Sequence, residues 1–234
     1  MKRFIFGGTT EGRMLAEQYI AAGDEVIACV TSGYGKSLLP EDATVYAGPL
    51  DEDAMRALIA RHAPDELIDA THPFAEQVTR NIRACAEALR LPYRRVNREG
   101  DACSDFSGDV AWAENAEAAA TMLAVGQGAA LLTTGSHTLP VFTAHVAPER
   151  LFARILPTVE AITGAKSAGI LPSHIIAMQG PFSQALNEAL YDQLGICAMV
   201  TKDSGDIGGV RDKVIPALAR DMQVIIIGRP QEGE

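Results

Sequence analysis

The sequence has few of the features that mark disulfide-rich, metal-binding, nucleic-acid-binding or membrane proteins. It holds 4 cysteines in 234 residues and no C-x-x-C pair, so we expect buried thiols rather than a zinc site or disulfides. Its 20 Lys and Arg are outnumbered by 30 Asp and Glu, and the net charge of −10 argues against binding to nucleic acid or an anionic membrane. No segment approaches 18 consecutive apolar residues, and a strand is expected directly after Lys2 and Arg3. We therefore expect a cytoplasmic protein without a signal peptide, of undetermined oligomeric state, with a monomer as one expectation.

The N-terminal stretch has a pattern that can hold a phosphate. The apolar run at residues 4–6 predicts a short buried strand, followed by Gly7-Gly8-Thr9-Thr10-Glu11-Gly12 and a periodic helix. Such a joint aims backbone N–H groups and the positive end of a helix dipole at one point. The spacing is G-G-x-x-x-G rather than G-x-G-x-x-G, so a plain turn with no ligand is an equal alternative for this stretch.

Strands and helices alternate along the rest of the chain. Strands are predicted at residues 25–30, 45–46, 66–69, 92–96, 130–132, 151–156, 175–178, 196–200 and 224–227. Helices are predicted between them, among them one after the cap residue Asp51, one starting at Pro73, and those at 116–125 and 210–218. This predicts an α/β fold of two Rossmann-like domains, residues 1–97 and 98–234, each a mainly parallel sheet flanked by helices, with a ligand cleft between them.

The loops that follow the predicted strands have a common chemistry. They read Gly-Gly-Thr-Thr, Thr-Ser-Gly, Thr-His-Pro-Phe, Thr-Gly-Ser-His, Gly-Pro-Phe-Ser and Thr-Lys-Asp-Ser-Gly. Helix capping explains any one of these loops, but six small, polar loops at the ligand-binding edge of parallel sheets favour a binding site.

The end of the second predicted strand bears on the identity of the ligand. An NAD site usually has an acidic residue there, for the ribose 2′-hydroxyl. This chain has Thr31, Ser32 and Gly33, with Lys36 close behind. Hydroxyls and a cation suit a 2′-phosphate, so NADPH is expected over NADH, which stays possible.

Taken together, the loops resemble one known family. The motifs Asp69-Ala70-Thr71-His72-Pro73-Phe74-Ala75, Thr134-Gly135-Ser136-His137, Gln179-Gly180-Pro181-Phe182-Ser183, Thr201-Lys202-Asp203-Ser204-Gly205 and Arg229-Pro230, with the glycine turn, resemble the precorrin-6A reductase family of cobalamin biosynthesis. The resemblance runs nearly end to end. It implies reduction of one double bond in a corrin-precursor macrocycle by a reduced nicotinamide cofactor. It leaves open whether the macrocycle is metal-free or contains cobalt.

The resemblance also assigns roles to residues. Cofactor-binding residues would be Gly7, Gly8, Thr9, Thr10, Glu11, Gly12, Thr31, Ser32, Gly33, Thr71, His72, Pro73 and Phe74. The substrate is a polycarboxylate tetrapyrrole, for which the candidates are Arg98, Ser136, His137, Arg154, Lys202, Asp203, Ser204, Arg211 and Lys213. No metal site is expected.

Reduction of the macrocycle also needs a proton donor. His72, His137, His145 and Asp203 are candidates, and the sequence does not choose among them. The charged segment 97–108 is predicted to be a linker that closes over the substrate as a lid.

Three alternatives remain: another Rossmann-type NAD(P)H reductase, a nucleotide-binding sensor or scaffold without catalysis, and an S-adenosylmethionine-dependent tetrapyrrole methyltransferase. A short-chain dehydrogenase is disfavoured, because none of the 5 tyrosines has a lysine four positions later.

Overall fold

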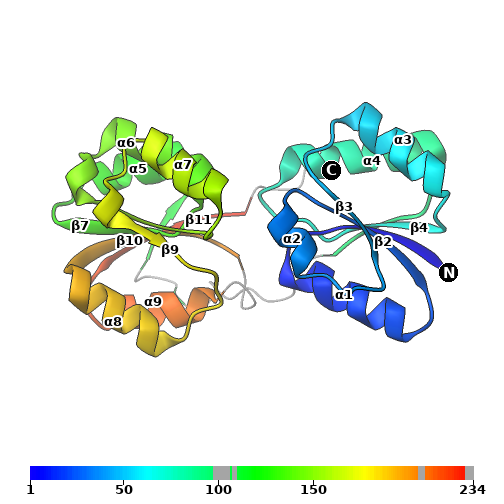
Figure 1. The fold of residues 1–234 in the computed structure, drawn as a ribbon. Helices are drawn as coiled ribbons and strands as arrows, with labels where there is room; N and C mark the ends of the chain where they lie inside the picture. The colour runs from blue at the N-terminus through cyan, green and yellow to red at the C-terminus, as the bar shows by residue number, and fades with distance from the viewer. Residues whose placement is uncertain (97–105, 107–109, 205–208, 230–234) are drawn as a thin grey trace. The chain divides into compact units, whose positions relative to one another are not determined.

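The computed structural model describes residues 1–96, 106, 110–204 and 209–229. The chain divides into two compact units, Met1–Arg98 and Glu99–Glu234 (Figure 1). Apart from Phe106, the segment 97–108, predicted as a linker and lid, lies outside the described residues. The predicted cleft between two domains stays a prediction.

The first unit is a five-stranded parallel sheet with helices on both faces. Its strand order is β3-β2-β1-β4-β5. Figure 1 shows α3 and α4 over one face of this sheet and α1 over the other. Its elements are β1 (Lys2–Phe6), α1 (Thr10–Ala21), β2 (Glu25–Val30), α2 (Gly33–Ser37), β3 (Thr44–Ala47), α3 (Glu52–His62), β4 (Glu66–Asp69), α4 (Glu76–Leu89) and β5 (Tyr93–Arg95).

Burial on both faces explains the continuous apolar runs in this sheet. Successive side chains of a strand point to opposite faces. Phe4 and Phe6 pack in the cluster that also contains Ile59 of α3, whereas Ile5 packs with Ala16 of α1. A strand covered on both sides needs apolar residues at every position, which is why β1 ends in three consecutive buried apolar side chains.

The second unit has the same architecture with one more strand among the described residues. Its parallel sheet has the order β6-β11-β10-β7-β8-β9, with α5, α6 and α7 on one face and α8 and α9 on the other (Figure 1). Its elements are β6 (Ala111–Ala113), α5 (Ala116–Val125), β7 (Ala129–Leu132), α6 (Leu139–His145), β8 (Leu151–Ile155), α7 (Val159–Ser167), β9 (Ile175–Ala177), α8 (Gln184–Leu194), β10 (Ile196–Lys202), α9 (Val210–Leu218) and β11 (Gln223–Ile227), with single 3-10 turns at Ser136–Thr138, Pro148–Arg150 and Pro172–His174.

The α/β prediction is confirmed, and the prediction of buried thiols is wrong for one of the three described cysteines. Cys29 and Cys85 are buried as expected, whereas Cys197 on β10 is exposed, and Cys103 lies outside the described residues. The pairing of β10 with β7 is irregular between Ile196 and Ala198, so Cys197 is left out of the ladder register. In the described part of the chain, no helix is both long and apolar enough to cross a membrane.

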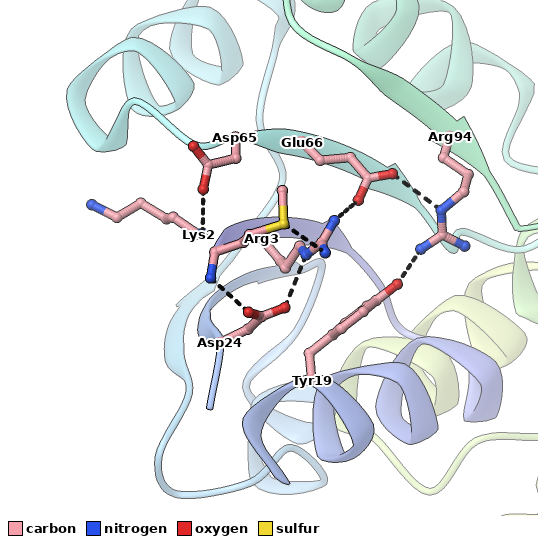
Figure 2. A network of polar contacts seen from close by, with 8 residues as sticks. Lys2, Arg3, Tyr19, Asp24, Asp65, Glu66 and Arg94 are labelled. Atoms are coloured by element: carbon pink, nitrogen blue, oxygen red, sulfur yellow. Dashed lines mark hydrogen bonds and ion pairs between the residues drawn. The ribbon is translucent and has the colours of Figure 1, made fainter. Parts of the chain in front are cut away.

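A network of charged side chains joins the strands of the first unit at the amino-terminal edge of its sheet (Figure 2). Arg3 on β1 pairs with Asp24 and with Glu66 on β4, and Glu66 also accepts from Arg94 Nε on β5 at 3.2 Å. Arg94 donates in turn to the Tyr19 hydroxyl on α1. The amino-terminal ammonium and Arg3 hold the pKa of Asp24 below its usual range. Glu66 therefore links three adjacent strands through two guanidinium groups.

We expect Glu66→Gln to lower the free energy of unfolding by about 1 kcal/mol, because Arg94 loses its anionic acceptor and Arg3 keeps only Asp24 among the described carboxylates. Glu52→Gln is the matched control, since Glu52 is exposed and its carboxylate pairs with a single arginine of the described residues, Arg56, at 3.6 Å. Urea unfolding of both variants measures the difference. Equal midpoints for the two variants would contradict a central role for Glu66.

Candidate functional site

The first unit has a hollow where its strand order reverses. The chain connects β1 to β2 and β3 on one side of the sheet and then crosses to β4 and β5 on the other. Loops at such a reversal diverge from the carboxyl edge and leave a crevice. A cavity of about 250 Å³ lies here. Its lining residues are Phe6, Gly7, Gly8, Thr9, Cys29, Val30, Thr31, Gly48, Pro49, Leu50, Met55, Thr71, His72, Ala75 and Val78.

The glycine turn forms one wall of this cavity. Gly8 has a φ of +112°, which side-chain-bearing residues rarely adopt, and a Cβ at Gly8 would meet no atom within 4 Å. Thr9 caps α1: its hydroxyl accepts from Gly12 N at 3.2 Å and donates to Ala70 O at 2.9 Å. A Cβ at Gly12 would lie 3.3 Å from the Ala70 Cβ, so Gly12 permits close packing of α1 on β4. The turn thus presents backbone to the cavity, while Thr9 and Gly12 hold it against the strand.

The structure brings six of the predicted cofactor residues together and places the others outside the cavity wall. Gly7, Gly8, Thr9, Thr31, Thr71 and His72 line it. Thr10, Glu11 and Gly12 form the first turn of α1, and Ser32 and Gly33 begin α2, where the Ser32 hydroxyl accepts from Gly35 N at 3.1 Å. Pro73 and Phe74 lie in the turn before α4, which begins at Glu76, so the prediction of a helix start at Pro73 is wrong.

A buried ion pair supports the loop after β4. Asp69 is fully buried, and its Oδ1 lies 2.5 Å from Arg95 Nη1. The same oxygen accepts from the Thr71 hydroxyl at 2.7 Å, and Asp69 Oδ2 accepts from the Tyr93 hydroxyl at 3.2 Å. Arg95 also donates to the Thr71 hydroxyl at 2.8 Å. Sequence reasoning missed Arg95 and Tyr93, although both lie in the strand predicted at residues 92–96.

His72 presents its ring at the start of the same loop. Its Nδ1 accepts a hydrogen bond from Phe74 N at 3.3 Å, and the two rings lie 5.6 Å apart. In the neutral ring this bond leaves the proton on Nε2. His72 therefore lines the cavity and also stabilises the turn to Phe74.

In the second unit, the strand order reverses between β10 and β7. Thr133 N donates to Val200 O at 2.9 Å, which joins the ends of these two strands. Ser136 and His137 follow in a 3-10 turn, and the buried Asp203 and Ser204 follow β10. The predicted loops therefore share one edge of this sheet.

Besides His72, two of the four candidate proton donors have side-chain partners among the described residues. The Asp203 carboxylate pairs with Arg229, with 3.0 Å between Oδ2 and Nε. His145 lies 2.6 Å from Glu117 Oε1. His137 is exposed.

The cations proposed for the substrate differ in their surroundings. Arg154 and Lys213 are buried, Lys202 is half-buried and Arg211 is exposed, whereas Arg98 lies outside the described residues. Burial lowers the pKa of the Lys202 ammonium. Among the described residues, no group of three or more His, Cys, Asp or Glu side chains is arranged to hold a metal ion.

Apolar side chains at the same edge of the second sheet also escaped sequence reasoning. Leu156 directly follows β8 and is 50% exposed, and Met178 directly follows β9 and is 39% exposed. Met178 N donates to Ile155 O at 3.0 Å, so the two strand ends are neighbours. The sequence assigned both residues to the strands themselves, where burial is the rule.

Comparison with known proteins agrees with this arrangement. Residues 3–234 match the family model of precorrin-6x reductase CbiJ/CobK. The chain is 37% identical to the cobalt-precorrin-6A reductase of Priestia megaterium, over 97% of this chain and 90% of the relative. It is 33% identical to that of Salmonella typhimurium, over 97% and 86%. The precorrin-6A reductase of Mycobacterium tuberculosis is 26% identical, over 97% and 88%.

A solved structure, CobK precorrin-6A reductase, has the same fold, with a TM-score of 0.81, 24% identity, and coverage of 100% of this chain and 90% of that one. With a family model spanning almost every residue and relatives above 30% identity over nearly their whole length, the chain belongs to the precorrin-6x reductase family.

Proposed function

We propose that this reductase transfers a hydride from NADPH to a double bond of a cobalt-containing corrin precursor. Family membership makes the chain an oxidoreductase of the precorrin-6A reductase type. The observation that carries the proposal is the cavity at the first strand reversal, because the glycine turn and the His72 loop line it together. Cobalt is proposed because relatives at 37% and 33% identity are named cobalt-precorrin-6A reductases, against 26% for a precorrin-6A reductase.

The first unit fits a nicotinamide dinucleotide. Gly7 and Gly8 leave room for a pyrophosphate against the backbone, at the positive end of the twelve-residue helix α1. When bound, the reduced nicotinamide supplies the hydride. Thr71 and His72 would flank the nicotinamide half, and the Asp69–Arg95 pair would keep their loop in place.

The choice of NADPH over NADH rests on the end of β2. Thr31 and Ser32 offer hydroxyls there, and no acidic side chain stands among residues 31–37 to repel a 2′-phosphate. Lys36 is exposed in the last turn of α2 and adds a positive charge. The dissociation constants of NADPH and NADH, measured as described below, distinguish between the two cofactors.

We propose that His72 donates the proton that reduction of the macrocycle requires. Its Nε2 carries the proton in the neutral tautomer and its ring lines the cavity. Asp203 is less suited, because its carboxylate is engaged in an ion pair with Arg229.

The second unit is proposed to bind the macrocycle. Ser136, His137, Asp203 and Ser204 lie at its strand reversal, and the cationic candidates Arg154, Lys202, Arg211 and Lys213 lie on β8, β10 and α9. The exposed Leu156 and Met178 would cover part of the apolar ring, a role for which exposed apolar side chains at a binding edge are suited. A cytoplasmic location and a monomeric state stay predictions.

The reaction is tested with purified protein, NADPH and the cobalt precursor under anaerobic conditions. We expect nicotinamide absorbance to fall only when the macrocycle is present. NADPH binding without this loss would favour a sensor, and binding of S-adenosylmethionine instead would favour a methyltransferase. Faster turnover of the metal-free precursor would overturn the choice of cobalt.

Ser32→Asp should weaken NADPH binding about tenfold or more and leave NADH binding unchanged or improved. Aspartate caps α2 as serine does, so the change adds a carboxylate near the proposed 2′-phosphate without removing the cap. Ser32→Asn is the control, since it keeps a cap without charge. Fluorescence titration gives both dissociation constants, and equal shifts for the two cofactors would contradict the assignment.

His72→Asn should lower kcat by about 10²- to 10⁴-fold while the dissociation constant of NADPH stays the same. An asparagine oxygen can accept from the N–H two residues on, so the turn to Phe74 is retained. Single-turnover kinetics across pH measures the effect. If His72→Asn keeps the wild-type rate and pH profile, the proton comes from elsewhere.

A further inference from the structure

Arg154 is a buried cation in the second unit, near the carboxyl end of β8. The residue is 7% exposed. Its Nη1 donates to Asn187 Oδ1 at 2.7 Å, and its guanidinium carbon lies 4.2 Å from the centre of the Phe182 ring. Burial lowers the pKa of this guanidinium, although an arginine stays protonated in proteins.

In the described part of the chain, no carboxylate forms an ion pair with Arg154. Its hydrogen-bonding partner Asn187 is a neutral amide that is 1% exposed. A buried charge without a counterion destabilises the fold, and buried arginines are for that reason normally paired. Arg95 in the first unit differs, because its side chain is 10% exposed and pairs with the fully buried carboxylate of Asp69.

The surroundings add to the positive potential. Asn187 Nδ2 donates to Ser183 O and to Asp212 O, both at 3.0 Å. Ser183 is the N-cap of α8, and Asp212 is the third residue of α9. The guanidinium is therefore one hydrogen bond away from the first turn of α8 and two from that of α9, and the positive end of a helix favours an anion and disfavours a cation.

We propose that Arg154 is the receptor for one carboxylate of the macrocycle, with Asn187 as its positioning residue and Phe182 as the ring that covers it. The half-buried Phe182 lies in the loop after β9, at the carboxyl edge of the sheet, and turns aside when the carboxylate binds. The exposed Leu156 stands two residues beyond Arg154 on the same strand end, where the apolar ring would lie. This inference rests on the proposed function and deepens it.

Arg154→Met tests whether Arg154 binds a carboxylate of the macrocycle, because methionine fills similar space without charge. An octacarboxylate porphyrin serves as the binding probe, and its affinity is followed by absorbance titration. We expect its dissociation constant to rise tenfold or more, with NADPH affinity unchanged and a melting temperature equal to or above that of the wild type. Arg150→Met is the control: Arg150 donates to Gly128 O at 2.9 Å, so its loss should lower the melting temperature without changing porphyrin affinity.

Porphyrin affinity unchanged by Arg154→Met, or an equal loss of NADPH affinity, would overturn the inference. Arg154→Lys keeps the charge on a shorter side chain and should give an intermediate affinity; an affinity as low as that of Arg154→Met would also count against recognition by charge. The wild type is assayed for macrocycle-dependent NADPH oxidation in parallel. A wild type that binds the porphyrin through Arg154 but oxidises no NADPH would refute the proposed function and leave the receptor standing.

Discussion

Parallel pairing of the strands is the constraint on which this structure depends. Each pair of parallel neighbours requires a crossover connection, so every strand is followed by a return across a face of its sheet, and the strand ends collect at one edge. The strand order reverses between β1 and β4, where a cavity lies, and again between β10 and β7 in the second unit. Within each unit, loops that are far apart in the sequence therefore lie at the same edge of the sheet. The topology of the sheet brings them there, and no local sequence pattern is needed for it.

Much of the fold could be predicted, because apolar runs and helix caps are local signals. The strands at 25–30 and 66–69 and the helices at 116–125 and 210–218 have the predicted bounds. The strand β6 was missed because two of its three residues are alanines, which are depleted in strands, and α2 was missed because its two glycines disfavour a helix. β10 continues through Lys202, beyond the predicted end at 200, because polar Thr201 and Lys202 still pair with β11.

The loops of the candidate site could be predicted from the sequence, but the side chains that pair with the loop residues could not. Parallel topology alone places Gly7, Thr71 and His72 near one another. The ion pair between Asp69 and Arg95 spans 26 positions, and the bond between Arg154 and Asn187 spans 33, so both depend on tertiary packing that no local pattern records. Arg154 and Lys202 lie near the carboxyl ends of β8 and β10, where the proposed polycarboxylate ligand would need positive charge.

Hydrogen exchange of the whole chain tests the central claim that both strand reversals bind ligands. NADPH should slow exchange of the amides after β1 and β4. Addition of the macrocycle should slow exchange after β7 and β10. Protection confined to the amino-terminal edges of the sheets, or absent from the loops of one unit with both ligands bound, would contradict the account.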